Sequence, residues 1–211
     1  MIVTQVKGGC LAPRRRVVRS VAPRLHNRHG LSPAKPAGPR TIHSSAMLII
    51  FSGLPGVGKT AIARELARTI GAVHLRIDSI EQALRRAGYR VEGEGYEVAY
   101  VVAEDNLRVG RTVIADCVNP WLLTRSDWRS VAERVGAAAL DVEIVCSDRT
   151  EHRRRVESRE PDIAGHALPT WPDVVERDYQ PWDRNRLVVD TAASGVTAGV
   201  LAIVSRLSAQ P

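Results

Sequence analysis

The chain contains five short runs rich in apolar residues, and longer amphipathic stretches separate these runs. The runs cover residues 48–51, 73–77, 112–115, 142–146 and 187–191. An uninterrupted apolar run such as 48–51 is typical of a strand that is buried on both faces. In the stretches between and after the runs, apolar residues recur at helical spacing, as they do from Val200 to Leu207 near the end of the chain. The pattern therefore predicts an α/β fold.

A glycine-rich segment follows the first run. Gly53 and Gly58 are separated by four residues, and Lys59 and Thr60 come next, which completes the pattern Gly-x-x-x-x-Gly-Lys-Thr. Apolar residues then recur at helical spacing until Gly71, a residue type that favours a helix end. Strand, glycine loop and helix come in the order that binding of a nucleoside triphosphate requires. We predict a phosphate loop here; the alternative is a glycine-rich turn without a ligand.

Each residue type in this loop has a physical role in holding ATP and Mg²⁺. The glycines allow the backbone to curl so that successive N–H groups face the phosphate oxygens. The ammonium of Lys59 is expected between the β- and γ-phosphates, and the hydroxyl of Thr60 is expected to bind Mg²⁺. Lys59 is the only lysine in residues 47–211, at the position where a compact point charge is needed. The predicted nucleotide contacts are Gly53, Leu54, Pro55, Gly56, Val57, Gly58, Lys59, Thr60 and Ala61.

Two aspartates come directly after predicted strands. Asp78 follows the run 73–77, and Asp116 follows the run 112–115. Because open parallel sheets bind ligands beyond the carboxyl ends of their strands, we expect Asp78 near the γ-phosphate and Asp116 near Mg²⁺. The alternative role for either residue is a helix cap or a turn. Cys117 stands where many ATPases carry a water-activating Glu, which argues against pure ATP hydrolysis, and no Asn-Lys-x-Asp guanine motif occurs.

An arginine-rich segment follows the fourth run. Five arginines occur within residues 149–159, and Arg155 and Arg159 share one face of a helix because they are four residues apart. We predict a lid at about 148–170 whose arginines neutralise charge on the transferred phosphoryl group and cover the adenine. The alternative is a solvated helix with salt bridges. For Trp171 and Trp182, which follow, core packing is the default expectation and a wall of the substrate site is the alternative.

The charge of the chain is divided unevenly. The net charge is +7, but residues 1–46 hold nine Lys/Arg and no Asp or Glu, whereas residues 47–211 hold 21 Lys/Arg and 23 Asp/Glu. The near-neutral larger part gives no reason to expect a nucleic-acid partner. We expect residues 1–46 to be a disordered basic tail. Three explanations compete: a basic arm for nucleic acid, an organelle transit peptide, and an artefact of an upstream start with the native chain beginning at Met47. We favour an artefact or a dispensable tail.

The order of these motifs resembles a known group of proteins. Phosphate loop, strand-Asp-Ser, strand-Asp, arginine-rich helix and strand-Asp-Thr follow one another as in the small P-loop kinases that carry an AAA domain. These kinases are related to chloramphenicol phosphotransferase, the polynucleotide 5′-kinase domain and the zeta toxins. The resemblance covers about residues 47–208. It implies a three-layer α/β P-loop NTPase fold, with a five-stranded parallel sheet flanked by helices and an arginine-rich lid.

The resemblance also implies roles for individual residues. In these relatives the aspartate after the second strand takes the proton of the acceptor hydroxyl, and this role falls on Asp78. The lid carries one arginine near the adenine and one on the phosphates, which correspond to Arg155 and Arg159. An Asp-Thr pair beside the adenine corresponds to Asp190 and Thr191. The arginine that usually follows the second-strand aspartate is not evident in this sequence.

We therefore predict that residues 47–211 form an ATP- and Mg²⁺-dependent kinase acting on a small-molecule hydroxyl. The alternatives are a nucleotide-binding or slow ATPase module without an acceptor and, less favoured, a polynucleotide kinase. The cysteines are widely spaced and form no CxxC pattern, which favours a cytoplasmic protein. No apolar run approaches the ~20 residues of a membrane span, so we expect no membrane partner. We expect a monomer or homodimer. Residues that choose the acceptor are expected in 88–110, 119–128 and 160–182, which match no motif.

Overall fold

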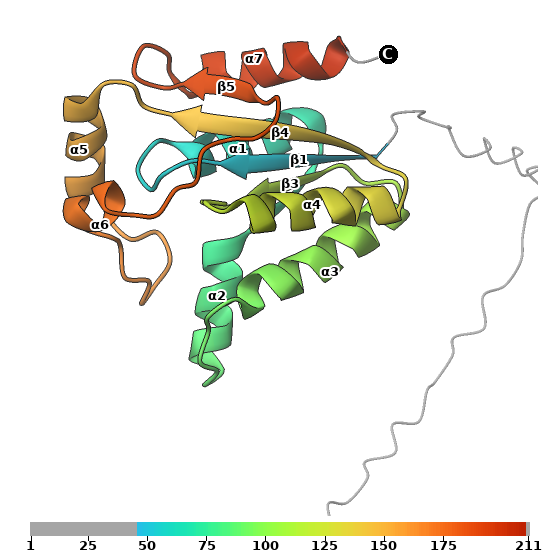
Figure 1. The fold of residues 1–211 in the computed structure, drawn as a ribbon, viewed down its shortest axis with the longest axis horizontal. Helices are drawn as coiled ribbons and strands as arrows, with labels where there is room; N and C mark the ends of the chain where they lie inside the picture. Colours follow the sequence, from blue (N-terminus) through green and yellow to red (C-terminus); the bar gives the residue numbers. More distant parts are fainter. Residues whose placement is uncertain (1–45, 210–211) are drawn as a thin grey trace, which may run out of the picture. The chain divides into compact units, whose positions relative to one another are not determined.

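The computed structural model describes residues 46–209, whose helices and strands are shown in Figure 1. The strands are β1 (Met47–Ser52), β2 (Val73–Arg76), β3 (Val113–Asp116), β4 (Ala138–Val145) and β5 (Leu187–Asp190). The helices are α1 (Lys59–Ile70), α2 (Ile77–Arg86), α3 (Glu94–Arg108), α4 (Leu122–Arg134), α5 (Arg149–Glu157), α6 (Trp171–Val175) and α7 (Val196–Ser208). The predicted basic tail lies outside the described residues, apart from its last residue.

The five strands form one parallel sheet in the order β2-β3-β1-β4-β5. The predicted five-stranded parallel sheet is thereby confirmed. The bounds of all five strands differ from the predicted runs, by one residue at each end that differs except at the start of β4. Strand β2 ends at Arg76, because Arg76 is its last residue paired with β3 and the chain turns directly into α2. Strand β4 begins earlier, at Ala138, where alanines of low strand propensity pair with β1 and gave no strand signal in the sequence.

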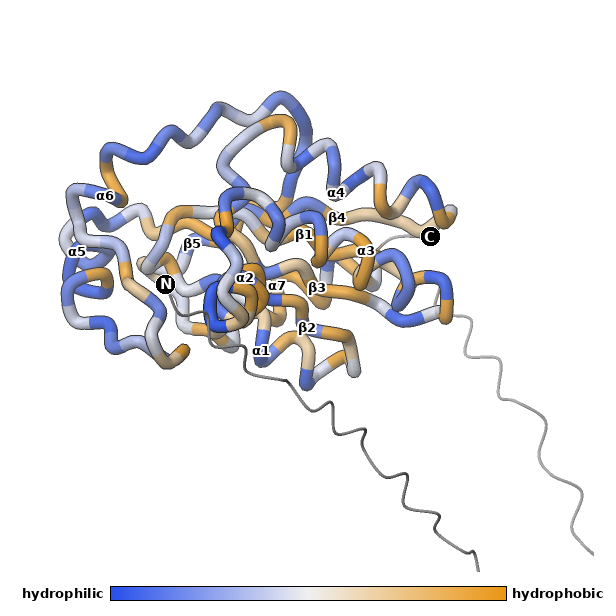
Figure 2. Tube along the Cα trace, turned by 90° about the horizontal axis from the view of Figure 1, so that it is seen from below, coloured by the Kyte–Doolittle hydropathy of each residue, from blue (hydrophilic) through white to orange (hydrophobic). Residues whose placement is uncertain are grey.

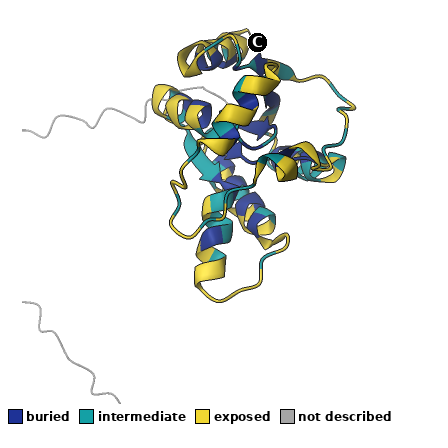
Figure 3. Ribbon diagram, turned by 90° about the vertical axis from the view of Figure 1, so that its left-hand side faces the viewer, coloured by how far each residue is buried: buried dark blue, intermediate teal, exposed yellow. Residues whose placement is uncertain are grey.

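Two helix layers cover the sheet, and the residues of β1 alternate between them. Leu48 and Ile50 pack into a buried cluster with residues of α3 and α4, whereas Ile49 and Phe51 pack into a second cluster with residues of α1 and α7. This alternation follows from the two-residue period of a strand. Figure 2 shows the hydrophobic strands β1 and β3 near the centre, and Figure 3 shows dark blue, buried strands there with the edge strand β2 only partly buried. The three-layer α/β architecture is confirmed.

The parallel strands place their carboxyl ends at one edge of the sheet. In Figure 1 the arrowheads point to the side on which α5 and α6 lie. The glycine-rich loop after β1, the residues after β3 and the segment after β4 therefore meet at this edge, which is where open α/β sheets bind ligands. None of the helices within residues 46–209 combines the length and the hydropathy that crossing a membrane requires.

Candidate functional site

The loop between β1 and α1 has the backbone conformation that its glycines allow. Gly53, Gly56 and Gly58 all have positive φ angles. At Gly53, with φ of +139°, a Cβ atom would lie 2.2 Å from the carbonyl oxygen of Ile144 on β4. No L-residue with a side chain fits there, so the glycine is required by both its backbone angle and its close approach to β4. The N-terminus of the 12-residue helix α1 follows directly and directs its free N–H groups toward the same side as the loop.

Lys59 is buried at the first position of α1, and its ammonium nitrogen donates a hydrogen bond to the carbonyl oxygen of Leu54, 2.9 Å away. Burial lowers the pKa of Lys59 from 10.5 to about 8, and the negative charges of Asp116 and Asp78 act in the opposite direction. Among residues 46–209 no carboxylate forms an ion pair with Lys59, and such a desolvated cation is well suited to hold a phosphate group. The influence of both aspartates on Lys59 also indicates that their side chains face the same region.

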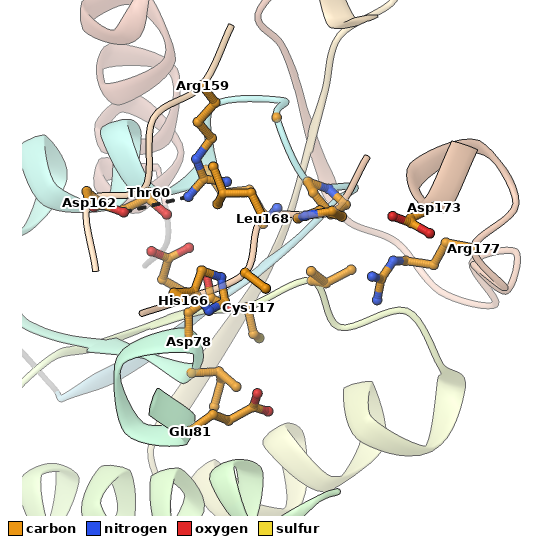
Figure 4. A pocket seen from close by; sticks show the side chains of 18 of the residues that line it. Thr60, Asp78, Glu81, Cys117, Arg159, Asp162, His166, Leu168, Asp173 and Arg177 are labelled. Carbon is orange, nitrogen blue, oxygen red and sulfur yellow. Dashed lines mark ion pairs between the residues drawn. The ribbon is translucent and has the colours of Figure 1, made fainter. Parts of the chain in front are cut away.

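A cavity of about 1140 Å³ opens at this edge of the sheet, and Figure 4 shows the side chains that line it. The predicted site residues that line it are Pro55, Gly56, Gly58, Lys59, Thr60, Ala61, Asp78, Asp116, Arg155 and Arg159. The predicted residues that do not line it are Gly53, Leu54, Val57, Asp190 and Thr191. The cavity therefore brings together residues from β1–α1, α2, β3 and the arginine-rich segment, which are far apart in the sequence.

The two predicted aspartates occupy different environments. Asp116 is the last residue of β3 and is buried, and one of its carboxylate oxygens lies 3.1 Å from Nε2 of His74 on β2. Asp78 is the second residue of α2 rather than a strand end, and its side chain is 37% exposed. Nη2 of Arg76 lies 3.4 Å from the Asp78 carboxylate, and Nε2 of His166 lies 4.0 Å from it. Asp116 is thus held in place, whereas Asp78 faces the open cavity.

Helix α5 carries Arg155 but ends at Glu157, so Arg159 lies beyond the helix, and the prediction that the two arginines share one helix face is wrong. Arg159 is directed toward Asp162, with 3.8 Å between Nη2 and the carboxylate. Arg155 donates to Oγ1 and to the backbone oxygen of Thr191, at 2.8 and 2.9 Å, and to Glu151. Thr191 in turn donates to the phosphate-loop carbonyl of Val57 at 2.8 Å. Asp190 accepts hydrogen bonds from the backbone N–H groups of Ser147 and Ala192. These contacts join helix α5, the residues after β5 and the phosphate loop.

A second cavity, of about 250 Å³, lies on the β5 side of the phosphate loop. It is lined by Gly58, Ile62, Arg155, Thr191, Ser194, Gly195 and Val196. Arg155 borders both cavities. That Arg155 and Thr191 lie beside an adenine remains a prediction. The smaller cavity, which both residues line, is the space that this adenine would occupy.

The segment after α5 folds back over the larger cavity. The carboxylate of Asp162 is paired with Arg76 and Arg64, and the backbone oxygen of Ala164 accepts hydrogen bonds from Gln82 and Arg86 of α2. The sequence analysis did not identify Arg64, Arg76 or Asp162 as site residues. No sequence signal could have paired them, because Arg76 and Asp162 are 86 residues apart.

All three stretches from which we expected acceptor-contacting residues contribute to the lining of the larger cavity. Tyr96 comes from the first stretch, Trp121 from the second and His166 from the third. Trp171 and Trp182 do not line it. The ring of Trp171 stacks edge-on against His152, and the ring of Trp182 lies under Arg125, 4.2 Å from its guanidinium carbon. Both tryptophans therefore have packing roles, and Trp121 is the tryptophan that faces the cavity.

Comparison with known proteins gives the family. The model of the AAA domain family matches residues 48–170, which is more than half of the chain, and the chain belongs to this family. A curated protein of Pyrococcus furiosus named "Putative adenylate kinase" is 38% identical over 73 residues. The match covers 33% of this chain and 39% of that protein, so this chain matches well under half the length of that relative.

Solved structures of P-loop kinases share the fold. An APS kinase from Mycobacterium tuberculosis, in complex with AMPPNP and APS, has a TM-score of 0.62 at 18% identity, covering 78% of this chain and 99% of that one. A gluconokinase from Sinorhizobium meliloti has a TM-score of 0.55 at 18% identity, with 78% and 93% covered. Chaetomium thermophilum Kti12 in complex with ADP-AlF3 has a TM-score of 0.58 at 18% identity, with 76% and 97% covered. The predicted resemblance to small P-loop kinases is confirmed, and the fold is that of a nucleotide-binding, kinase-like protein.

Proposed function

We propose that this member of the AAA domain family is a kinase that transfers the γ-phosphoryl group of ATP to a hydroxyl group of a small molecule. The observation that carries the proposal is that Lys59, Thr60, Asp78 and Asp116 line one cavity, together with lid residue Arg159. A kinase needs a cation on the phosphates, a metal ligand and a proton acceptor within one water-excluding site. These residues supply all three chemical types.

The residues at the phosphate loop fit a magnesium nucleotide. The glycine-lined turn, the buried ammonium of Lys59 and the start of α1 together offer hydrogen-bond donors to an anion. The Thr60 hydroxyl and the Asp116 carboxylate are oxygen groups of the kind that bind Mg²⁺ directly or through water. When bound, Mg²⁺ supplies positive charge that offsets the charge of the β- and γ-phosphate oxygens.

In the transfer step, a hydroxyl oxygen of the acceptor forms a bond to the γ-phosphorus as the bond from that phosphorus to the β–γ bridging oxygen breaks. ADP leaves with the bond's electron pair, and the hydroxyl proton passes to the carboxylate of Asp78. Asp78 suits this role because its side chain is accessible from the cavity, whereas Asp116 is buried and contacts His74. Lys59 and Arg159 contribute positive charge to the phosphoryl group as it moves.

The test uses the full chain with γ-labelled ATP and Mg²⁺, and follows the label across a panel of sugars, nucleosides, aminoglycosides and 5′-hydroxyl oligonucleotides. Asp78→Asn is compared with the wild type, and Asp105→Asn serves as a matched control because Asp105 is exposed on α3, away from the cavity. We expect label on one acceptor class with the wild type and the control. Asp78→Asn should lower the rate by a factor of about 10²–10⁴, the usual contribution of a general base.

Release of the label only as inorganic phosphate, at one rate in all three proteins, would contradict the kinase proposal. That outcome would favour a nucleotide-binding module with slow hydrolysis, in which Asp78 has no part in chemistry. Label transferred to oligonucleotides alone would instead identify a polynucleotide kinase.

A further inference from the structure

The carboxylate of Asp162, in the lid segment after α5, is surrounded by arginines from three different elements. Arg76, at the end of β2, donates to both of its oxygens, at 2.7 and 3.1 Å. Arg64 of α1 lies 2.6 Å from one of these oxygens, and Arg159 of the lid lies 3.8 Å from the other. Figure 4 shows Arg159 directed toward Asp162 beside Thr60. One carboxylate therefore occupies the point where three guanidinium groups converge.

This cluster carries more positive charge and more hydrogen-bond donors than Asp162 can satisfy. Besides Asp162, the carboxylates of Asp78, at 3.4 Å, and of Asp116 act on the charge of Arg76, and Asp78 faces the cavity. Arg76 is 5% exposed, and its Nε atom is buried without a hydrogen-bond partner among the described residues. A buried donor without a partner is costly, and buried arginines are usually saturated by carboxylate or phosphate oxygens. Three guanidinium groups offer more N–H donors than the two oxygens of one carboxylate accept, so an anion with more oxygen atoms fits this position better.

The cluster lies on one side of the predicted phosphate site. Strand β1, which leads into the phosphate loop, is at the centre of the sheet, with β2 at one edge and β5 at the other. The small cavity bordered by Thr191 is on the β5 side, whereas Arg76 ends β2 and Arg64 follows Thr60 by one turn of α1. Arg64, Arg159 and Asp162 line the same cavity as Asp78. The arginines are therefore placed beside the proposed base, on the side away from the small cavity.

We infer that Arg64 and Arg76 form an anion-binding subsite of the acceptor, with Arg159 between this subsite and the transferred phosphoryl group, and that the Asp162 carboxylate occupies the subsite in the structure. The acceptor is then a hydroxyl compound that also bears a phosphate or sulfate group. This inference rests on the proposed kinase function. A tetrahedral oxyanion offers three or more oxygen atoms to guanidinium groups and displaces the single carboxylate. Displacement of Asp162 releases one contact of the lid segment, so acceptor binding and lid position are coupled.

The subsite is tested with sulfate as the probe, on the full chain, with ADP-Mg²⁺ present so that the phosphate loop is occupied. Sulfate is titrated at constant ionic strength while the ¹H–¹⁵N signals of the arginine Nε–H groups are followed. Asp162→Asn removes the internal competitor, and we expect the sulfate dissociation constant to fall by about tenfold or more, the value of one or two charge-assisted hydrogen bonds. Adding Arg64→Gln to Asp162→Asn should reverse this gain. Arg64 is chosen over Arg76 because its side chain is 45% exposed, so its replacement leaves the fold intact.

Glu157→Gln is the matched control. It removes one negative charge from an exposed arginine pair on α5, that with Arg153, and Glu157 does not line the cavity. The control should bind sulfate as the wild type does. Equal dissociation constants for the wild type and Asp162→Asn, or no effect of Arg64→Gln in the Asp162→Asn protein, would overturn the inference.

Two further experiments distinguish failure of the acceptor inference from failure of the proposed kinase function. If AMPPNP-Mg²⁺ abolishes the sulfate binding that ADP-Mg²⁺ permits, the arginines contact the γ-phosphate of the donor, and the acceptor subsite is refuted. If the labelled-ATP assay transfers label to neutral hydroxyl compounds but not to anionic ones, the acceptor inference fails while the kinase function stands. Failure of ADP to bind, measured by calorimetry on the same samples, would remove the kinase function and the acceptor together.

Discussion

Nε2 of His152 lies 2.8 Å from the backbone carbonyl oxygen of Pro55, so helix α5 is hydrogen-bonded directly to the phosphate loop. Both groups are buried, and the His152 ring also packs edge-on against Trp171, with 5.2 Å between the ring centres. Because the carbonyl oxygen accepts, Nε2 of His152 must carry the proton. His152 is therefore a positioning residue that fixes the loop relative to α5.

Replacing His152 by Phe should weaken nucleotide binding. The substitution keeps the aromatic packing against Trp171 but removes the donor to Pro55. We expect the dissociation constant for ADP-Mg²⁺, measured by calorimetry, to rise by about fivefold, which corresponds to one ordinary hydrogen bond. Arg153→Gln, on the exposed side of the same helix, is the control. Identical ADP affinities for His152→Phe and the control would show that the contact does not position the loop.

Gly56→Ala should be more destabilising than an equivalent change elsewhere. Gly56 has φ of +84°, and a Cβ atom there would lie 2.5 Å from Cγ2 of Val156 on α5. Gly88 has a similar φ of +89° but no atom within 4 Å of its Cβ position. We expect Gly88→Ala to lower the free energy of unfolding by about 1 kcal/mol, the backbone cost, and Gly56→Ala by about 3 kcal/mol, because the clash is added. Equal losses of unfolding free energy for the two variants, measured by urea denaturation, would mean that α5 shifts to make room for the added methyl group at no cost.

The charge of Lys59 should make stability depend on pH. Burial lowers its pKa in the folded protein to about 8 from 10.5. Between these values the unfolded chain holds a proton that the folded protein has released, so the contribution of Lys59 to the free energy of unfolding rises with pH in this window. Below the folded pKa both states are protonated, and the full cost of burying the charge remains.

The measurement is the difference in unfolding free energy between the wild type and Lys59→Met. The wild type should gain about 2 kcal/mol relative to Lys59→Met between about pH 7.5 and about pH 9.5. Because the charged ammonium binds phosphate, ADP affinity of the wild type should fall over the same range. A pH-independent difference between the two proteins would contradict the lowered pKa.

Arg125 is a structural arginine, and its loss should be costly. It is fully buried and donates to the backbone oxygens of Asn119, Pro120, Gln180 and Pro181, at 3.0–3.2 Å. It thereby holds the cavity-lining loop after β3 to the segment before β5. Arg125→Met removes all four hydrogen bonds, although the Pro120 oxygen keeps the N–H of Gln180 as a donor. We expect a loss of about 3 kcal/mol or more in the free energy of unfolding.

The control for Arg125 is Arg134→Met, which removes an arginine whose side chain is 50% exposed and pairs with Glu104. This change should cost about 1 kcal/mol or less, as exposed ion pairs do. Urea denaturation of both variants gives the comparison. Similar losses would mean that other contacts hold the two segments together.

Some features of the site could be predicted from the sequence because the residues that form them are neighbours in the chain. The phosphate loop needs only a strand, three glycines, Lys59 and Thr60 in order, and the structure has this loop at the predicted place. The strand order at the sheet edges and the start of α2 at Ile77 could not be predicted from the sequence, because both depend on which strands pair. Arg76 is the last residue of β2 to pair with β3, and this pairing places Asp78 in the first turn of α2.

The sequence by itself determined the α/β class, the five strands, the phosphate loop and the edge of the sheet at which a ligand would bind. These follow from local periodicity and from a short motif whose residues act together because they are neighbours in the chain. Tertiary structure alone decided that Arg64, Arg76 and Arg159 converge on Asp162, and that Trp121 rather than Trp171 faces the cavity. Such contacts arise from the packing of segments many residues apart. In the sequence, each of these residues looks like an ordinary surface or core residue. The physical reason is that hydrogen bonds and ion pairs between distant segments have no period in the sequence.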